Sequence, residues 1–116
     1  MREVLISEEC HKFVEEEQQV KKKFLYLLQI LMEQKIIHSS FVKKLINTRF
    51  YELRISVKNE YRIMIFCCDH ENFNESSKAI LLNGFIKKNK KDYKKAIKIA
   101  EKLIMKYKKE CDEQDI

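Results

Sequence analysis

The chain has 116 residues, and its 24 basic and 18 acidic side chains give a formal net charge of +6. One domain spanning residues 1–116 is expected, because a chain of this length can bury roughly 60–70% of its unfolded surface, and the lack of proline with a single glycine excludes a flexible linker. The longest apolar stretch, residues 24–32, is too short to span a membrane, and the N-terminus does not resemble a signal peptide. We therefore expect a cytoplasmic protein without a membrane partner.

A short strand and two helices are predicted at the start of the chain. Residues 3–6 form the strand, and Ser7 can cap a helix whose first turn carries Glu8 and Glu9, where the helix dipole favours acids. An apolar stripe continues to about residue 34 and indicates two amphipathic helices that break near residues 17–19. We expect this stripe to cover the apolar face of a sheet; it consists of Cys10, Phe13, Val14, Val20, Phe24, Leu27, Leu28 and Leu31.

Two alternating segments, residues 51–57 and 61–65, predict a β-hairpin. A three-residue loop at residues 58–60 would place the apolar side chains on one face, in the pairs Val57 with Tyr61, Ile55 with Ile63 and Leu53 with Ile65. A two-residue loop would mix the two faces, which a half-buried sheet resists.

The opposite face of this hairpin carries two arginines, Arg54 and Arg62. In the predicted register they are diagonal neighbours with Cα atoms roughly 7–8 Å apart. Guanidinium groups this close can share an anion, and phosphate matches their forked donors and permanent charge. The alternative is that both are simply solvated strand positions.

A further strand and a helix complete the predicted order, after a polar loop at residues 69–77. Residues 79–86 are apolar on both faces, as in the interior of a sheet. Gly84 within them suggests a bend or the close approach of another backbone. Asp92 can cap the last helix, whose buried stripe is expected at Ala96, Ile97, Ala100, Leu103, Ile104 and Tyr107.

Positive charge is concentrated in this last segment. From Lys87 to Lys109 there are eleven lysines and two acids, a net charge of +9. Such clustering is typical of proteins that bind a polyanion, here nucleic acid or the ribosome. The alternative is a lysine-rich, solvated helix face.

The cysteines and histidines do not indicate a metal or cofactor site. Cys67 and Cys68 are adjacent, so on a strand they point to opposite faces, and the spacing of the four cysteines suits neither zinc nor a disulfide framework. We expect free thiols in a reducing compartment and histidines at the surface. The residues concerned are Cys10, Cys67, Cys68 and Cys111, with His11, His38 and His70.

Three motifs taken together resemble the signature of the RelE/HigB superfamily of bacterial toxins. They are Tyr51-Glu52-Leu53-Arg54, Tyr61-Arg62-Ile63 and Leu81-Leu82-Asn83-Gly84-Phe85-Ile86-Lys87-Lys88, and residues 42–48 are similar to the lysine-leucine segment that precedes the same hairpin in that family. Matching positions run from about residue 42 to residue 100. The resemblance implies a small α+β domain in which an N-terminal strand and two helices pack on a mainly antiparallel sheet and a basic helix follows.

The resemblance also implies an activity and partners. Such toxins belong to type II toxin–antitoxin systems, cut messenger RNA on the ribosome without metal or cofactor, and are held inactive by a cognate antitoxin, often a helix-turn-helix protein. The ribose 2′-hydroxyl attacks the adjacent phosphorus, a step that needs a proton acceptor, charge stabilisation and protonation of the leaving oxygen. By this resemblance we expect as catalytic residues Arg54, Arg62, Lys88 and Tyr93, and as RNA-binding residues Glu52, Phe85, Lys87, Lys90, Lys91, Lys94 and Lys95.

Two of these residues have more than one possible role. Nearby cations are expected to lower the pKa of Tyr93 and so allow it to share in proton transfer, or it stacks on a base; the alternative is a tyrosine packed against its helix. Glu52 is either a base or the ion-pair partner of Arg54. Relatives often open the last helix with threonine and proline, where this chain has Asp92, and no histidine lies on the predicted sheet, so a histidine-based mechanism is not expected.

Two other functions suit the same pattern. The superfamily also resembles ParE-type toxins, which inhibit DNA gyrase and do not cut RNA, so a non-catalytic binding module is the main alternative. Two arginines on one sheet face favour cleavage, because a module that binds only protein needs no phosphate clamp. A general RNA-binding protein would use aromatic stacking, for which Phe66 and Phe85 are the candidates.

Overall fold

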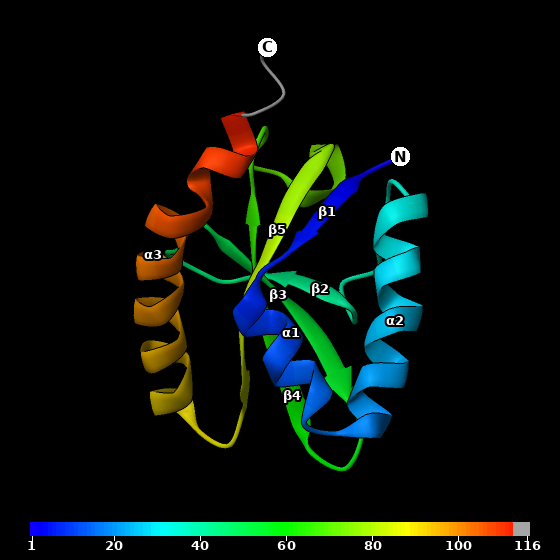
Figure 1. Ribbon diagram of the computed structural model, residues 1–116, viewed down its shortest axis with the longest axis vertical. Coiled ribbons are helices and arrows are strands. Elements are labelled where there is room, and N and C mark those ends of the chain that lie inside the picture. The colour runs from blue at the N-terminus through cyan, green and yellow to red at the C-terminus, as the bar shows by residue number, and fades with distance from the viewer. Residues whose placement is uncertain (113–116) are drawn as a thin grey trace.

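The computed structural model describes residues 1–112, and the last four residues of the predicted domain lie outside the described part. A five-stranded sheet separates two helical layers (Figure 1). The strands are β1 (Glu3–Ile6), β2 (Val42–Lys44), β3 (Phe50–Ser56), β4 (Glu60–Cys67) and β5 (Lys78–Ile86), and the helices are α1 (Glu8–Glu15), α2 (Gln18–Glu33) and α3 (Lys90–Asp112), with a 3-10 turn at Phe73–Glu75. The predicted α+β fold is confirmed.

The sheet has the order β1-β5-β4-β3-β2 and is antiparallel except for the parallel pair β1 and β5. The sequence pattern predicts every one of these strands except β2. That strand has three residues, too few to show an alternation.

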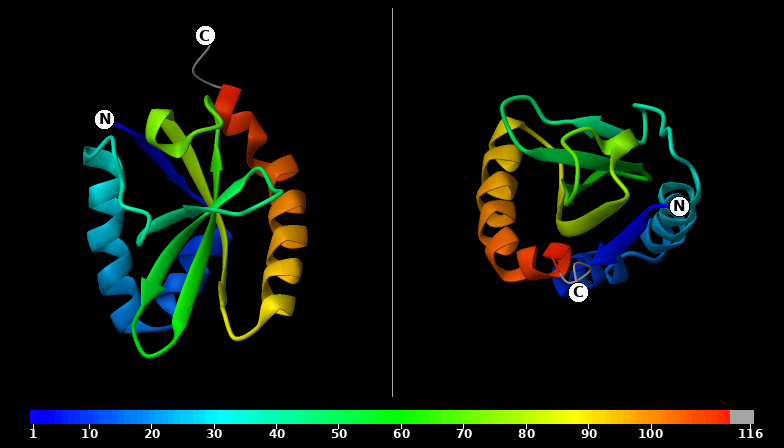
Figure 2. Two further views of the ribbon diagram at one scale, coloured as in Figure 1. Left: turned by 180° about the vertical axis from the view of Figure 1, so that it is seen from behind. Right: turned by 90° about the horizontal axis from the view of Figure 1, so that it is seen from above.

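Helices α1 and α2 lie on one face of the sheet and α3 lies on the other (Figures 1 and 2). The first face buries the predicted helical stripe against Leu53, Ile55, Ile63 and Ile65. The second face buries three side chains of α3, Ala96, Ala100 and Ile104, against Phe50, Met64, Ile80 and Leu82. The face predicted to be open to RNA is therefore covered by α3 over much of its area.

Local hydrogen bonds explain where α1 and α2 begin. The Ser7 hydroxyl accepts from the backbone amide of Cys10 at 3.0 Å, which confirms the predicted cap. Glu17 caps α2 in the same way by accepting from the amide of Gln19 at 3.2 Å. The break between the two helices lies at residues 16–17, next to the predicted position near residues 17–19.

The start of α3 differs from the prediction. Asn89, and not Asp92, is the cap, because its side-chain oxygen accepts from the amide of Lys91 at 2.9 Å. Asp92 accepts in return from the amide of Asn89 at 2.9 Å, which makes a capping box. The hydrogen bond from the amide of Asn89, together with one from the amide of Lys88 at 2.7 Å, lowers the pKa of Asp92.

The β3–β4 hairpin has the predicted faces but a different register. Its loop comprises residues 57–59, so Leu53 pairs with Ile63 and Arg54 lies directly opposite Arg62. The predicted diagonal arrangement of the arginines is therefore wrong. A shift of two residues leaves every side chain on its own face, which is why alternation alone did not reveal it.

Gly84 is required by a close contact between β5 and the helix α1 that packs on it. A Cβ atom at this position would lie 2.1 Å from Cδ2 of Phe13 on α1, far inside van der Waals contact. The approaching group is thus an aromatic side chain and not another backbone, which was one of the two predicted reasons for this glycine. The other reason, a bend, agrees with the register shift that separates the pairs Ile63–Gly84 and Ile65–Leu81. Gly84 allows α1 to pack directly on β5.

The cysteines differ from the expectation of four free thiols. Cys68, just beyond β4, forms a disulfide with Cys111 in the last turn of α3, with the Cα atoms 5.3 Å apart. Cys10 and Cys67 remain free. The pairing joins residues that are 43 positions apart in the sequence, where only the fold can show that they meet. His11, His38 and His70 are exposed, as expected.

Candidate functional site

The site centres on the carboxylate of Glu52, which three donors approach. Its Oε1 atom lies 3.1 Å from Nε of Arg54 and 3.1 Å from Nε of Arg62, and it accepts a hydrogen bond of 3.1 Å from the Tyr93 hydroxyl. Glu52 and Arg54 alternate along β3, Arg62 faces them from β4, and Tyr93 comes from the first turns of α3. The two arginines converge as expected, but the space between them holds a carboxylate.

Arg62 is the more enclosed of the two arginines, with only 2% of its side chain exposed. Besides its ion pair with Glu52, Arg62 donates hydrogen bonds to the Tyr93 hydroxyl at 3.3 Å, to Glu60 at 3.2 Å and to the backbone carbonyl of Tyr61 at 3.1 Å. Burial alone would lower the pKa of this guanidinium, but the surrounding acceptors outweigh it and raise the pKa. Arg62 is therefore a charged and fully engaged part of the protein interior.

Arg54 differs because 29% of its side chain is exposed. Its Nε atom forms an ion pair with Glu52, while Glu52 itself is only 3% exposed. Of the two arginines predicted to hold a phosphate, Arg54 is the one that an anion can reach from solvent.

Tyr93 closes the cluster from the side of α3. Its ring packs edge-on against Phe85, with the ring centroids 5.2 Å apart. Burial, helped by the neighbouring carboxylate of Glu52, raises the pKa of its hydroxyl even though the hydrogen bond from Arg62 acts in the opposite direction. The expectation that cations lower this pKa is therefore wrong, and at neutral pH Tyr93 is a proton donor.

A group of exposed lysines borders this cluster. β5 ends at Ile86, the amide of Lys87 still pairs with the carbonyl of Glu60 at 2.8 Å, and α3 begins three residues later. The loop after β5 and the first turns of α3 therefore carry six exposed lysines near Tyr93 in the sequence: Lys87, Lys88, Lys90, Lys91, Lys94 and Lys95. We call these six residues the lysine rim.

The charges of the site divide into two groups. Glu52 and Glu60 balance Arg54 and Arg62, so the inner cluster is neutral overall. The excess positive charge comes from the lysine rim. Anion binding here would begin at the rim and at Arg54 and not at a bare pair of arginines.

Glu60 is the member of the site that sequence reasoning missed. It was assigned to the hairpin loop, but it opens β4 two residues before Arg62 and so shares its face. Hydrogen bonds from Ser56 and Arg62, despite slight desolvation, lower the pKa of its carboxyl group. The spacing of two within an alternating segment is the signal that could have identified it.

No metal-binding arrangement is found in residues 1–112, where no three His, Cys, Asp or Glu side chains converge suitably. Within the same residues no helix is long and apolar enough to cross a membrane.

Comparison with known protein families identifies one family to which the chain is similar. The family model described as "Phage derived protein Gp49-like (DUF891)" matches residues 11–105. The chain belongs to the Gp49-like family. The matched region of this Gp49-like protein includes the Glu52 cluster, Tyr93 and the whole lysine rim, and membership is consistent with a toxin of the RelE/HigB type. No curated protein and no solved structure matches the chain.

Proposed function

We propose that this Gp49-like protein is the toxin of a type II toxin–antitoxin pair and an endoribonuclease that cuts messenger RNA on the ribosome. The observation that carries the proposal is the meeting of Arg54, Arg62 and Tyr93 at one carboxylate beside the lysine rim. Family membership supports the toxin part, and an antitoxin is the partner it suggests. The charge pattern supports RNA as the substrate.

In this proposal Arg54 and the lysine rim bind the RNA backbone. Arg54 is 29% exposed, and when a phosphate draws it away from Glu52, that buried carboxylate keeps its ion pair with Arg62. Lys87 and Lys88 lie where β5 ends and supply further donors for the scissile phosphate. Phe85 lies edge-on to Tyr93 and gives a flanking base an aromatic surface.

Arg62 acts as a positioning residue and not as a direct phosphate ligand. It is 2% exposed and holds both Glu52 and the Tyr93 hydroxyl through its Nε atom. Fixing these two groups holds the Tyr93 hydroxyl at Glu52, the carboxylate that also binds Arg54. Removal of Arg62 would therefore disturb the site through its neighbours.

The chemistry is an internal transfer that needs no further reactant. The ribose 2′-hydroxyl gives up its proton to solvent water as its oxygen forms a bond to the adjacent phosphorus. The bond from phosphorus to the 5′-oxygen breaks, the 5′-oxygen takes up a proton, and the products are a 2′,3′-cyclic phosphate and a 5′-hydroxyl. Tyr93 holds a proton at neutral pH because its pKa is raised, so with Lys88 it is a candidate to protonate the leaving oxygen. Arg54 stabilises the charge that grows on the phosphorane.

The direct test expresses the chain without an antitoxin and follows messenger RNA on ribosomes. We expect wild type to arrest growth and to cut transcripts, and Arg54→Met to reduce cleavage by about 10²-fold or more, the usual effect of removing one charge-stabilising donor. Arg49→Met is the matched control, since Arg49 is an exposed arginine bound to Glu101 at 2.6 Å, away from the site. Equal activity of the two variants would remove Arg54 from the mechanism.

The lysine rim is tested by the salt dependence of RNA binding. Lys87→Gln with Lys88→Gln should weaken binding and lower the slope of log affinity against log salt by about 2. The control is Lys108→Gln with Lys109→Gln, which removes the same charge from the far end of α3. If both double variants weaken RNA binding and lower the salt slope equally, the binding depends on net charge alone and not on the lysine rim.

A ParE-type gyrase inhibitor is the second candidate, and one observation favours it. The charges of Arg54 and Arg62 are already balanced by Glu52 and Glu60, so the arginines need no phosphate for their neutralisation. A binding module without catalysis predicts loss of DNA supercoiling with intact transcripts. Ribosomal cleavage of messenger RNA with normal supercoiling supports the ribonuclease.

A further inference from the structure

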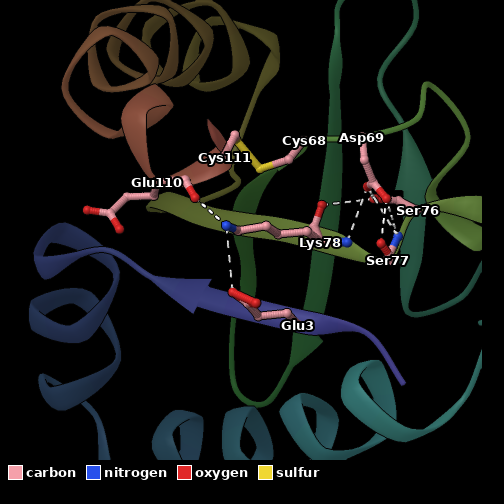
Figure 3. The surroundings of a disulfide bond; sticks show 8 residues. All are labelled: Glu3, Cys68, Asp69, Ser76, Ser77, Lys78, Glu110 and Cys111. Carbon is pink, nitrogen blue, oxygen red and sulfur yellow. Dashed lines mark hydrogen bonds and ion pairs between the residues drawn. A yellow bond between two sulfur atoms is a disulfide. The ribbon is translucent and has the colours of Figure 1, made fainter. Parts of the chain in front are cut away.

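A second feature of the fold lies at the end of α3 remote from Tyr93. The Cys68–Cys111 disulfide joins the last turn of α3 to the residue after β4 (Figure 3). Neither sulfur belongs to the candidate site, and the proposed RNA chemistry does not use them. Both cysteines are partly exposed, and Cys68 lines a surface cleft of about 590 Å³, so a small reductant can approach the bond.

The sheet side of the disulfide is firmly held. Asp69 follows Cys68 directly, and its carboxylate accepts hydrogen bonds from the Ser76 hydroxyl at 2.6 Å and from the amides of Ser77 and Lys78 at 3.0 and 3.2 Å. The amide of Cys68 itself donates to the carbonyl of Lys78 at 2.9 Å. These bonds fix Cys68 without any help from its partner sulfur.

The helix side is held much more weakly. The fully buried side chains of α3 are Ala96, Ala100 and Ile104, so the last two turns add only the partly buried Tyr107 and Cys111 to the packing. Besides the disulfide, the amino group of Lys78 donates to the carbonyl of Glu110 (Figure 3). Three surface contacts add to this: the Tyr107 hydroxyl donates to Glu9 at 2.7 Å and accepts from the amide of Glu8 at 3.2 Å, and the exposed Lys106 lies 3.3 Å from Glu9. If the disulfide opens, α3 is the side that moves.

Lys78 lowers the free-energy cost of releasing this end of α3 from the sheet. Its side chain is only 6% exposed, and its Nζ atom lies 3.7 Å from Oε2 of Glu3. The same amino group donates to a carbonyl in the last turn of α3, where the helix dipole favours a cation. When that turn leaves, water reaches the amino group and replaces the lost carbonyl. Release of the helix end is therefore cheaper than the loss of a buried hydrogen bond.

We propose that Cys68 and Cys111 form a reversible redox site that fastens and releases the C-terminal turns of α3. A dithiol reductant donates two electrons and two protons, the sulfur–sulfur bond breaks, both cysteines become thiols, and the reductant becomes a disulfide. Re-oxidation reverses each step. The inference rests on the proposed function in one respect, because a protein that acts on ribosomes meets such reductants, and disulfides there are typically transient.

The two free cysteines are poor competitors for this exchange. Burial raises the pKa of the Cys10 thiol to about 12 and that of Cys67 to about 11. Since the thiolate is the attacking species, both react slowly near neutral pH. The redox change is thus confined to Cys68 and Cys111.

The test compares the oxidised and reduced full-length protein by thiol counting, thermal unfolding and hydrogen exchange. Alkylation in denaturant should find two free thiols before treatment with dithiothreitol and four after it. Reduction should lower Tm by roughly 8–16 °C, the shift expected when a disulfide closing a chain segment of this length is lost from a 116-residue domain. Amide exchange should rise over residues 105–112 and stay unchanged over residues 66–78.

Matched variants make the outcome decisive. Cys67→Ser should keep the full response to dithiothreitol, whereas Cys68→Ser with Cys111→Ser should show none and should unfold at the temperature of the reduced protein. Four free thiols after exposure to oxidised glutathione, or exchange that rises equally in both segments, would overturn the proposal. None of these readouts involves RNA, so their failure leaves the ribonuclease proposal standing, and loss of the ribonuclease proposal leaves these results unchanged.

Discussion

Replacing Glu52 by glutamine should destabilise the fold far more than the same change at Glu60. Both carboxylates bind Arg62, at 3.1 and 3.2 Å, but their side chains are 3% and 48% exposed. Removing the buried partner leaves the Arg62 charge uncompensated, which in proteins costs about 3–5 kcal/mol. Arg62 retains the carbonyl of Tyr61 and half-exposed Glu60, so we expect roughly 2–4 kcal/mol for Glu52→Gln and under about 1 kcal/mol for Glu60→Gln.

Urea unfolding followed by circular dichroism at pH 7 measures both variants. The m-values should stay equal to that of wild type, so that the difference lies in the midpoint. The double variant Glu52→Gln with Arg62→Met should recover part of the loss, because it removes both buried charges together. If Glu52→Gln and Glu60→Gln lose the same stability, then Glu52 is not the carboxylate that compensates Arg62, and the account of the cluster is wrong.

Three further predictions concern the scaffold. Arg2 donates to five backbone carbonyls at 2.5–3.2 Å, so Arg2→Met should lower the urea unfolding free energy by about 3–5 kcal/mol; Arg49→Met, at an exposed pair, should lose under about 1 kcal/mol. Gly84→Ala forces a Cβ to 2.1 Å from the Phe13 ring and should cost about 1–3 kcal/mol; calorimetry with an unchanged Tm would contradict the packing. Partial burial would raise the pKa of Asp69, but hydrogen bonds from two serines and the backbone hold it well below its usual range. The stability that Asp69 contributes is therefore complete above the unfolded pKa of about 3.9 and is lost as the pH falls towards the folded value; urea unfolding of Asp69→Asn should depend less on pH below 5 than that of wild type.

Alternation and spacing predicted which way the hairpin side chains point. Leu53 and Ile63 lie on the face covered by α1 and α2, and Arg54 and Arg62 lie on the opposite face, because the period of two is a property of any strand. The register was missed because a loop at residues 57–59 instead of 58–60 preserves both faces. Local pattern thus determines the faces but not the partner of each residue.

The burial of Arg62 could not be predicted from the sequence. Its exposure is set by where α3 crosses the sheet, and that path depends on tertiary packing of Ala96 and Ala100 against Met64 and Leu82. The raised pKa of Tyr93 has the same origin, since burial of its hydroxyl where α3 meets the sheet is the largest cause. The residue types predicted which side chains belong to the site. The position of α3 determined how deeply Arg62 is buried and in which direction the pKa of Tyr93 shifts.

The most direct test of the proposed ribonuclease uses purified ribosomes programmed with one messenger RNA in two forms. The first is all ribose, and the second carries 2′-deoxyribose at the nucleotide where the first is cut. The account predicts cleavage of the first form to a 2′,3′-cyclic phosphate and a 5′-hydroxyl, with no cleavage of the second at that position. Equal cutting of both forms, or no cutting of either, would contradict it.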